Sequence, residues 1–156
     1  MEGLVGRVRG MRHATDPLAH LRGLAIFAEC SDEELAEIDA LSDEVRVPAG
    51  RFLIRQGDIG REFIVVIRGQ ALVTRDDVVV ARLGPGEYFG ELALLAATER
   101  NATVTAETDL VVSVIDRRGF QTVLEDSPSL TRSLLRSTAK RLAELDAENR
   151  RLRGVE

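Results

Sequence analysis

Short runs of valine, isoleucine and leucine, separated by turn residues, fill the middle of the chain over residues 45–115. Glycine, proline and aspartate gather at the turns, which fall at 48–50, 57–58, 69, 76–77 and 84–86. Strands divided by turns every 8–12 residues or so are typical of a β-sandwich, roll or barrel. We therefore expect a mainly β domain. The expected strands are 45–47, 52–56, 63–68, 71–74, 78–83, 102–106 and 111–115.

Helical patterns flank this β region on both sides. Residues 18–27 and 31–42 have helical spacing, and Ser31 with Glu34 has the pattern of a capping box. Residues 128–153 predict one long helix, because Pro128 suits a first turn and no further proline or glycine follows before Gly154. Inside the β region, residues 91–96 are good helix formers and predict a short helix. Residues 1–16 show no clear period and are expected to form a flexible arm.

Composition limits the classes of function. A chain of 156 residues that is 44% apolar and 30% charged fits one domain, and a net charge of −5 disfavours a nucleic-acid surface. We see no signal peptide or membrane span, so we expect a cytoplasmic protein that contacts neither membrane nor nucleic acid. His13 and His20 lack metal-ligand spacing, and the single Cys30 is expected to pack. Neither a metal nor a cofactor is expected.

The segment 89–106, FGELALLAATERNATVTA, combines groups that suit a sugar phosphate. Gly90 lets the backbone approach a ligand closely, and the amides of Leu92 and Ala93 would point from a helix start towards an anion. Arg100 supplies a planar guanidinium for two phosphate oxygens, and Glu91 supplies an acceptor for a ribose 2′-hydroxyl. Taken singly, each has an ordinary explanation: a turn, a helix dipole or a solvated surface charge.

The joint spacing resembles the phosphate-binding cassette of cyclic-nucleotide-binding domains, which reads FGELAL followed by an Arg-Ala-Ala or Arg-Ser-Ala type triplet and a strand. The resemblance covers roughly residues 21–145. It implies a β-roll, similar to a jelly roll, flanked by helices over 17–127, with the helix of 128–156 as a lid or dimerisation element. It also assigns the ligand contacts. Glu91 would bind the ribose and Arg100 the cyclic phosphate, assisted by the amides of Gly90, Leu92 and Ala93, with Asn101 and Ala102 completing the triplet.

Two departures from the family pattern concern the ligand. Glu99 stands where many members have proline, and Asn101 stands where the family has Ala, Ser or Thr; a hydroxyl there is associated with the amino group of guanine. In relatives of the catabolite-activator type, hydroxyl side chains of the long helix meet adenine, and those positions fall here on Leu145 and Asp146. Asp146 would accept from the adenine amino group, which favours cAMP. The alternatives are cGMP held by Asn101, or an Asp146 that only pairs with Arg141 of a partner helix or with Arg150 one turn on.

The long helix contains a heptad register that predicts a parallel homodimer. Leu135, Leu142 and Asn149 take the a positions, and Thr138, Leu145 and Leu152 take the d positions. Across the dimer, Arg141 would then face Asp146, and Glu148 would face Arg153. The alternative is an amphipathic helix that lies on its own domain.

Taken together, the sequence predicts a receptor or regulatory module in which a cyclic nucleotide repositions the C-terminal helix. A second hypothesis keeps the fold without the ligand, as a dimerisation or interaction module. A third, an enzyme on a β-barrel, lacks metal ligands and a Ser/His/acid set, so we expect no catalysis. The effector is expected to be another protein or a further domain, because the chain carries no helix-turn-helix after its long helix.

Overall fold

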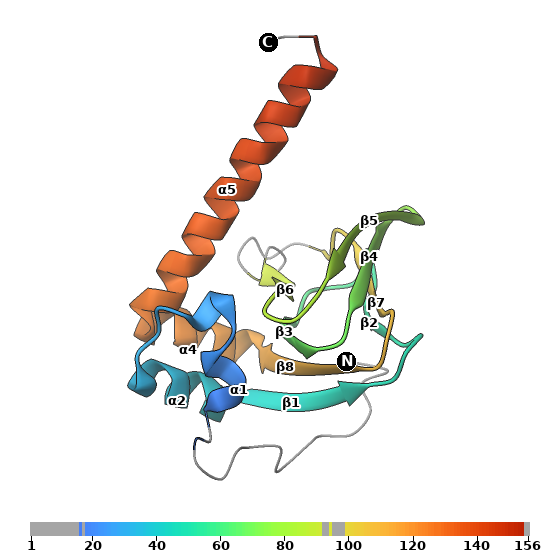
Figure 1. The fold of residues 1–156 in the computed structure, drawn as a ribbon. Coiled ribbons are helices and arrows are strands. Elements are labelled where there is room, and N and C mark those ends of the chain that lie inside the picture. The colour runs from blue at the N-terminus through green and yellow to red at the C-terminus, as the bar shows by residue number, and fades with distance from the viewer. Residues whose placement is uncertain (1–15, 17, 92–93, 95–98, 155–156) are drawn as a thin grey trace.

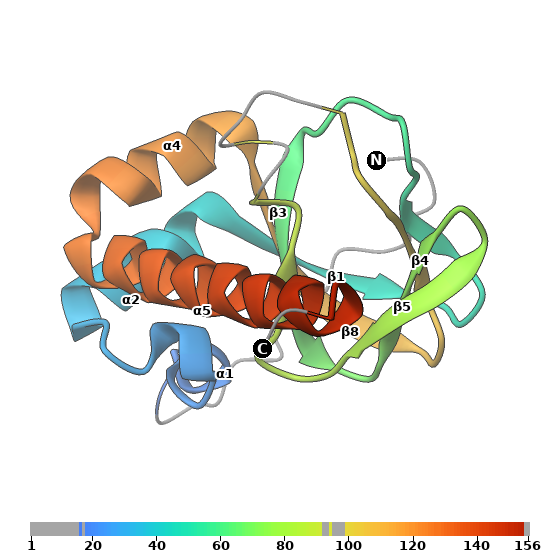
Figure 2. The same cartoon turned by 90° about the horizontal axis from the view of Figure 1, so that it is seen from above.

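Two antiparallel sheets form a roll, with helices packed at one end and a long helix that extends away from it (Figure 1). The computed structural model describes residues 16, 18–91, 94 and 99–154 of the chain. In the view from above, α4 and α1 flank the long helix α5 on either side (Figure 2). The mainly β class with flanking helices is therefore confirmed.

In the described part of the chain, each sheet has four strands. The first has the order β1 (Ser42–Val47), β8 (Leu110–Asp116), β3 (Glu62–Arg68) and β6 (Tyr88–Phe89). The second has the order β2 (Phe52–Ile54), β7 (Thr103–Ala106), β4 (Ala71–Arg75) and β5 (Val78–Leu83). Seven of these strands correspond to the seven expected ones, with shifts at some ends. β6 was not predicted, because two residues are too short to show an alternating pattern.

Strand β3 lies at the centre of the packing, and its sequence shows why. Phe63 and Val65 point to one core, which the helices cover, whereas Ile64 and Val66 point to a second core inside the roll. All four side chains are almost fully buried. A strand that is covered on both faces has a continuous apolar run instead of an alternating one.

The helices differ from expectation at two places. The single helix expected over 18–27 is wrong: α1 (Ala19–Arg22) ends at Gly23, Leu24 is extended, and a 3-10 turn η1 (Ala25–Phe27) follows. This break lets the apolar side chains on both sides of Gly23 enter the core. The next helix, α2 (Asp32–Leu41), begins as predicted with a capping box between Ser31 and Glu34.

Helix α4 (Arg117–Asp126) was not predicted. The side chain of Asp116 caps it by accepting from the Gly119 amide at 2.7 Å. Phe120 and Val123 of this helix are buried at helical spacing, so the signal was present in the sequence. A glycine in the first turn weakens the helical signal of the sequence. The packing explains this glycine, because a Cβ on Gly119 would lie only 3.0 Å from the Ile115 side chain.

The long helix α5 (Pro128–Leu152) begins at Pro128, as predicted. Its first turns pack on the domain through Leu130 and Leu134, whereas its later leucines are exposed. The exposed ones are Leu135, Leu142, Leu145 and Leu152, at 57–78%. Among the described residues, no helix is long and apolar enough to cross a membrane. The arm expected over 1–16 lies outside the described residues except for Asp16.

Candidate functional site

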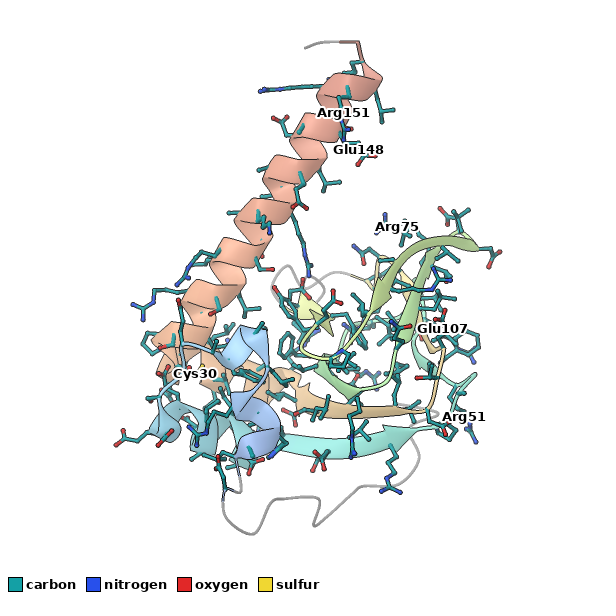
Figure 3. The ribbon with its side chains drawn as sticks, viewed as in Figure 1. Cys30, Arg51, Arg75, Glu107, Glu148 and Arg151 are labelled. Carbon is teal, nitrogen blue, oxygen red and sulfur yellow. The ribbon has the colours of Figure 1, made fainter. Side chains whose placement is uncertain are left out.

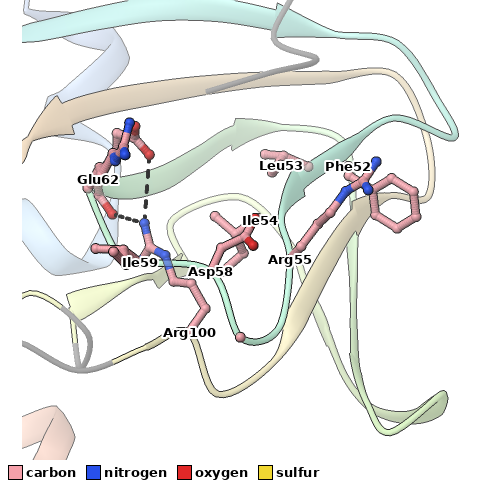
Figure 4. Close-up of a pocket in the computed structure, with 10 residues that line it drawn as sticks. Phe52, Leu53, Ile54, Arg55, Asp58, Ile59, Glu62 and Arg100 are labelled. Atoms are coloured by element: carbon pink, nitrogen blue, oxygen red, sulfur yellow. Dashed lines mark hydrogen bonds and ion pairs between the residues drawn. The ribbon is translucent and has the colours of Figure 1, made fainter.

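The site centres on Arg100, an arginine whose residue is only 4% exposed. Its Nη1 donates to the carbonyl oxygen of Gly90 at 3.0 Å, and its Nη2 donates to the carbonyl oxygen of Glu62 at 2.8 Å. The Glu62 carboxylate lies 3.7 Å from the same Nη2 (Figure 4). A guanidinium has five N–H donors, so these two bonds leave others for an anionic ligand.

The backbone of Arg100 is fixed by the loop between β2 and β3. The Arg100 amide donates to the Asp58 carbonyl at 2.7 Å, and the Arg100 carbonyl accepts from the Gly57 amide at 2.9 Å. Ile59 and Glu99 form a β-bridge beside them. This loop, strand β2 and Arg100 line a cavity of about 650 Å³, with Glu62 on its wall (Figure 4). The cavity falls within the usual size of a small-molecule site.

Burial shapes the electrostatics of this cavity. It lowers the pKa of the Arg100 guanidinium, an effect that the negative charges of Glu62 and Glu91 oppose. Burial likewise raises the pKa of the Glu62 carboxyl, against the nearby positive charges. An arginine remains charged in proteins, so Arg100 is a partly desolvated cation that an anion would stabilise.

Gly90 has a role that the sequence did not suggest. We expected this glycine to allow close approach of a ligand, which stays a prediction; in the structure it allows close approach of Arg100. Its φ is +97°, and a Cβ there would lie 2.6 Å from Arg100 Nη1 and 2.6 Å from the Glu62 carbonyl oxygen. Glycine at this position is therefore required by the packing of the protein itself.

Glu91 is 3% exposed and forms an ion pair that sequence reasoning did not find. Its Oε1 accepts from Arg141 Nη1 at 2.9 Å, and the Arg141 guanidinium lies over the Tyr88 ring at 5.2 Å from the centroid. Arg141 belongs to α5, 50 residues further along the chain. The pair therefore joins the long helix to the roll at the proposed ribose acceptor.

The other predicted contacts fall at several places. Leu92 and Ala93 lie outside the described residues, as do 95–98; Glu91 and Leu94 are helical, as the helix expected over 91–96 requires. Asn101 is exposed, and Ala102 is buried. Asp146 is exposed and pairs with Arg150 at 3.3 Å, the arrangement left open above.

Two residues of the site were missed, Glu62 and Arg141. Glu62 stands next to the apolar run of β3, where a carboxylate is ordinarily a strand-end charge. Arg141 is one of several cations on α5, and its heptad position predicted an ion pair across a dimer instead. Only the approach of β3 and α5 to the Gly90 turn identifies them. Within the residues that the structure describes, no group of three or more metal-ligating side chains gathers.

Comparison with known proteins follows this geometry. Residues 44–127 match the family described as "cyclic nucleotide-binding domain". The cAMP-dependent protein kinase regulatory subunit of Schizosaccharomyces pombe is 44% identical over 96 residues, which is 61% of this chain and 23% of that protein. An uncharacterized NTE family protein of Mycobacterium bovis is 31% identical over 137 residues, 87% of this chain and 24% of that protein.

Among solved structures, the catabolite activator protein of Thermus thermophilus has a TM-score of 0.76 and 29% identity to this chain. The superposition covers 81% of this chain and 62% of that one. Thus the chain matches most of a known fold, yet it spans about a quarter of the length of the curated relatives named above.

Proposed function

The chain belongs to the family of cyclic-nucleotide-binding domains, and on that premise we propose that it is a cAMP receptor module whose ligand controls the position of α5. The chain's own part is recognition and conformational change, without catalysis. The effector that responds is a further domain or a separate protein.

Arg100 carries this proposal. It is a buried guanidinium whose backbone and two N–H groups are held by the protein, and its remaining N–H groups make no bond among the described contacts. A cyclic phosphate has one negative charge and two exocyclic oxygens, which match a planar pair of N–H donors. Because the site is preorganised, little conformational entropy is lost on binding.

The Glu91–Arg141 ion pair supports the coupling to α5. The carboxylate that would accept from the ribose 2′-hydroxyl is held by Arg141 at 2.9 Å. A nucleotide that engages Glu91 changes the balance of this contact. Beyond its first turns, α5 is otherwise joined to the domain, among the described contacts, by an exposed ion pair between Arg136 and Glu29. Two states of α5 that differ in this contact then have different affinities for the ligand, as allosteric coupling requires.

The preference for cAMP over cGMP depends on Asp146. If α5 moves towards the bound base, the Asp146 carboxylate accepts from the adenine amino group, whereas it would face the guanine oxygen with two acceptors unpaired. Asp146 is exposed, and its described ion pair is with Arg150 of the same helix at 3.3 Å, so a rotamer change of either side chain frees it. Asn101 would favour cGMP instead, because its side chain could bond the amino group of guanine.

Homodimer formation through α5 is the second candidate function, and it is compatible with the first. Leu135, Leu142 and Leu145 are each more than half exposed at the predicted a and d positions. An apolar stripe of this kind on a solvent-exposed helix is typical of a coiled-coil seam. In the single chain Arg141 engages Glu91 instead of a partner's Asp146.

Calorimetric titration of the wild-type chain with cAMP and cGMP tests the proposed function. We expect binding of both, with cAMP tighter. Arg100→Ala should weaken cAMP by about 2–5 kcal/mol, roughly 30-fold to several thousand-fold. Arg82→Ala on β5 is the matched control: it removes an exposed ion pair with Glu107, which follows β7, and should leave affinity unchanged. If neither nucleotide binds, only the dimerisation function remains.

Hydrogen exchange along α5 tests the coupling. In the wild type, cAMP should change amide protection in the turns around Arg141. Arg141→Ala should raise exchange there without ligand and shrink the ligand-induced difference, because the contact that ligand alters is already lost. Unchanged protection of α5 in the wild type on saturation with cAMP would contradict the coupling.

A further inference from the structure

The tight turn between β4 and β5 contains two strained residues outside the site described above. Asp76 and Asp77 have φ of +51° and +64°, and they are the described non-glycine residues with positive φ. Such values at both central positions match the turn that joins two hairpin strands, where Asp is tolerated. The turn is exposed, so its position depends on specific contacts.

Gln56 makes those contacts with its carboxamide. Its Nε2 donates to Asp76 Oδ1 at 2.9 Å, and its Oε1 accepts from the Asp76 amide at 3.0 Å. The two bonds form a reciprocal pair that joins the turn to the start of the β2–β3 loop. Figure 3 shows the neighbouring Arg75 on the same hairpin. Its Nε donates to the carbonyl oxygen of Asn101 at 2.9 Å.

Both contacts end directly beside Arg100. Gln56 precedes Gly57, whose amide donates to the Arg100 carbonyl, and Asn101 follows Arg100 in the chain. The Gln56 amide also donates to Thr103 Oγ1 at 2.9 Å. The hairpin turn therefore holds the chain on two sides of the residue that carries the guanidinium.

We propose that Gln56, Arg75 and Asp76, here called the turn clamp, are positioning residues that fix Arg100 for the phosphate without touching the nucleotide. The proposal rests on the proposed function, because it assigns how that same site is aligned. The clamp acts on the backbone, whereas Gly90 and Glu62 hold the guanidinium. The guanidinium of Arg100 is aligned for the phosphate only when both its backbone and its guanidinium group are fixed.

The size of the effect follows from the kind of contact. The clamp bonds lie at the surface, where one hydrogen bond contributes modestly, so losing them should weaken cAMP by about three- to tenfold, far less than losing Arg100. Gln56→Ala removes both bonds to the turn. Asp76→Gly removes the carboxylate bond alone and keeps a residue that favours positive φ. We expect Gln56→Ala to have the larger effect.

Asp77→Gly is the matched control. It changes the same turn, the same charge and the same kind of backbone conformation, but its side chain does not contact Gln56 among the described contacts. Its affinity for cAMP should equal that of the wild type. Because Gln56 and Asp76 act through one pair, the double variant should bind no more weakly than Gln56→Ala.

A phosphate-specific readout separates positioning from general destabilisation. Each phosphorothioate diastereomer of cAMP carries sulfur in place of one exocyclic oxygen, and a well-placed Arg100 should distinguish them. In Gln56→Ala we expect the ratio of the two Kd values to shrink by about threefold or more, with the melting temperature close to that of the wild type. Both Kd values rising by the same factor, or no discrimination in the wild type, would overturn the clamp. A wild type that binds cAMP while every clamp variant binds equally well overturns the clamp alone, whereas a wild type that binds no cyclic nucleotide overturns the proposed function.

Discussion

Replacing Gly90 by alanine adds only one methyl group, but we expect it to disrupt the site strongly. The added Cβ would lie 2.6 Å from the Glu62 carbonyl oxygen and from Arg100 Nη1. Ordinary contact begins near 3.4 Å, so both separations must grow by about 0.8 Å. The carbonyl belongs to β3, where Glu62 pairs with Asp116 of β8, so the turn at residue 90 and the guanidinium have to shift instead.

The magnitude has two parts. The φ of +97° costs an alanine roughly 1–2 kcal/mol of folding stability, whatever its neighbours. Displacing the cation by nearly an ångström from its aligned position should then weaken cAMP by about 10- to 100-fold. Stability and affinity fall for different reasons, and the assay must measure both.

Gly50→Ala separates the two parts. Gly50 has a φ of +88°, and nothing lies within 4 Å of an added Cβ, so this variant has the backbone cost without the clash. We expect both variants to lose stability in urea unfolding, Gly90→Ala the more because of the clash, and only Gly90→Ala to lose affinity in calorimetry. A wild-type Kd for Gly90→Ala would refute the claim that this glycine exists to admit Arg100.

Three further predictions follow from single side chains. Glu91→Gln should weaken cAMP, whereas the 2′-deoxy analogue should bind wild type and variant with much more similar Kd values, measured by calorimetry; independent, additive losses would remove Glu91 from the ribose. Burial raises the pKa of the Glu34 carboxyl. The hydrogen bonds that it accepts from Ser127, Ser31 and Ser129 outweigh burial and hold this pKa at about 2, below the ordinary value of 4.5. The charged Glu34 carboxylate therefore stabilises the fold fully above about pH 4.5 and loses this contribution as the pH falls towards 2. In Glu34→Gln, the free energy of unfolding measured by urea titration should therefore fall less between pH 6 and pH 3 than it does in the wild type. Asn149→Leu should strengthen self-association of α5 or loosen its register, and a monodisperse wild-type monomer in light scattering at high concentration, with and without cAMP, would contradict the dimer.

Local patterns in the sequence determined much of this protein. Turn residues at regular spacing predicted seven strands, and Ser31 with Glu34 predicted the start of α2. Pro128 marked the start of α5. These features depend on contacts between residues close in the chain, where periodicity and capping apply. The motif around Glu91 and Arg100 named the family for the same reason.

What the sequence could not determine involves distant segments. Glu34 binds Ser127 and Ser129, which are 93 and 95 residues away, and Arg141 reaches Glu91 across 50 residues. The periodicity of the sequence does not indicate which charged side chain of a helix pairs with which distant carboxylate.

Tertiary structure also decided the role of Gly90. From the sequence alone, a glycine before a helix is equally compatible with a turn, with close approach of a ligand or with close approach of another part of the protein. Only the folding of β3 and Arg100 against it placed a carbonyl and a guanidinium where a Cβ would otherwise lie. The sequence specified the groups that we propose hold a cyclic nucleotide, and packing between elements far apart in the chain decided which of them are held in place.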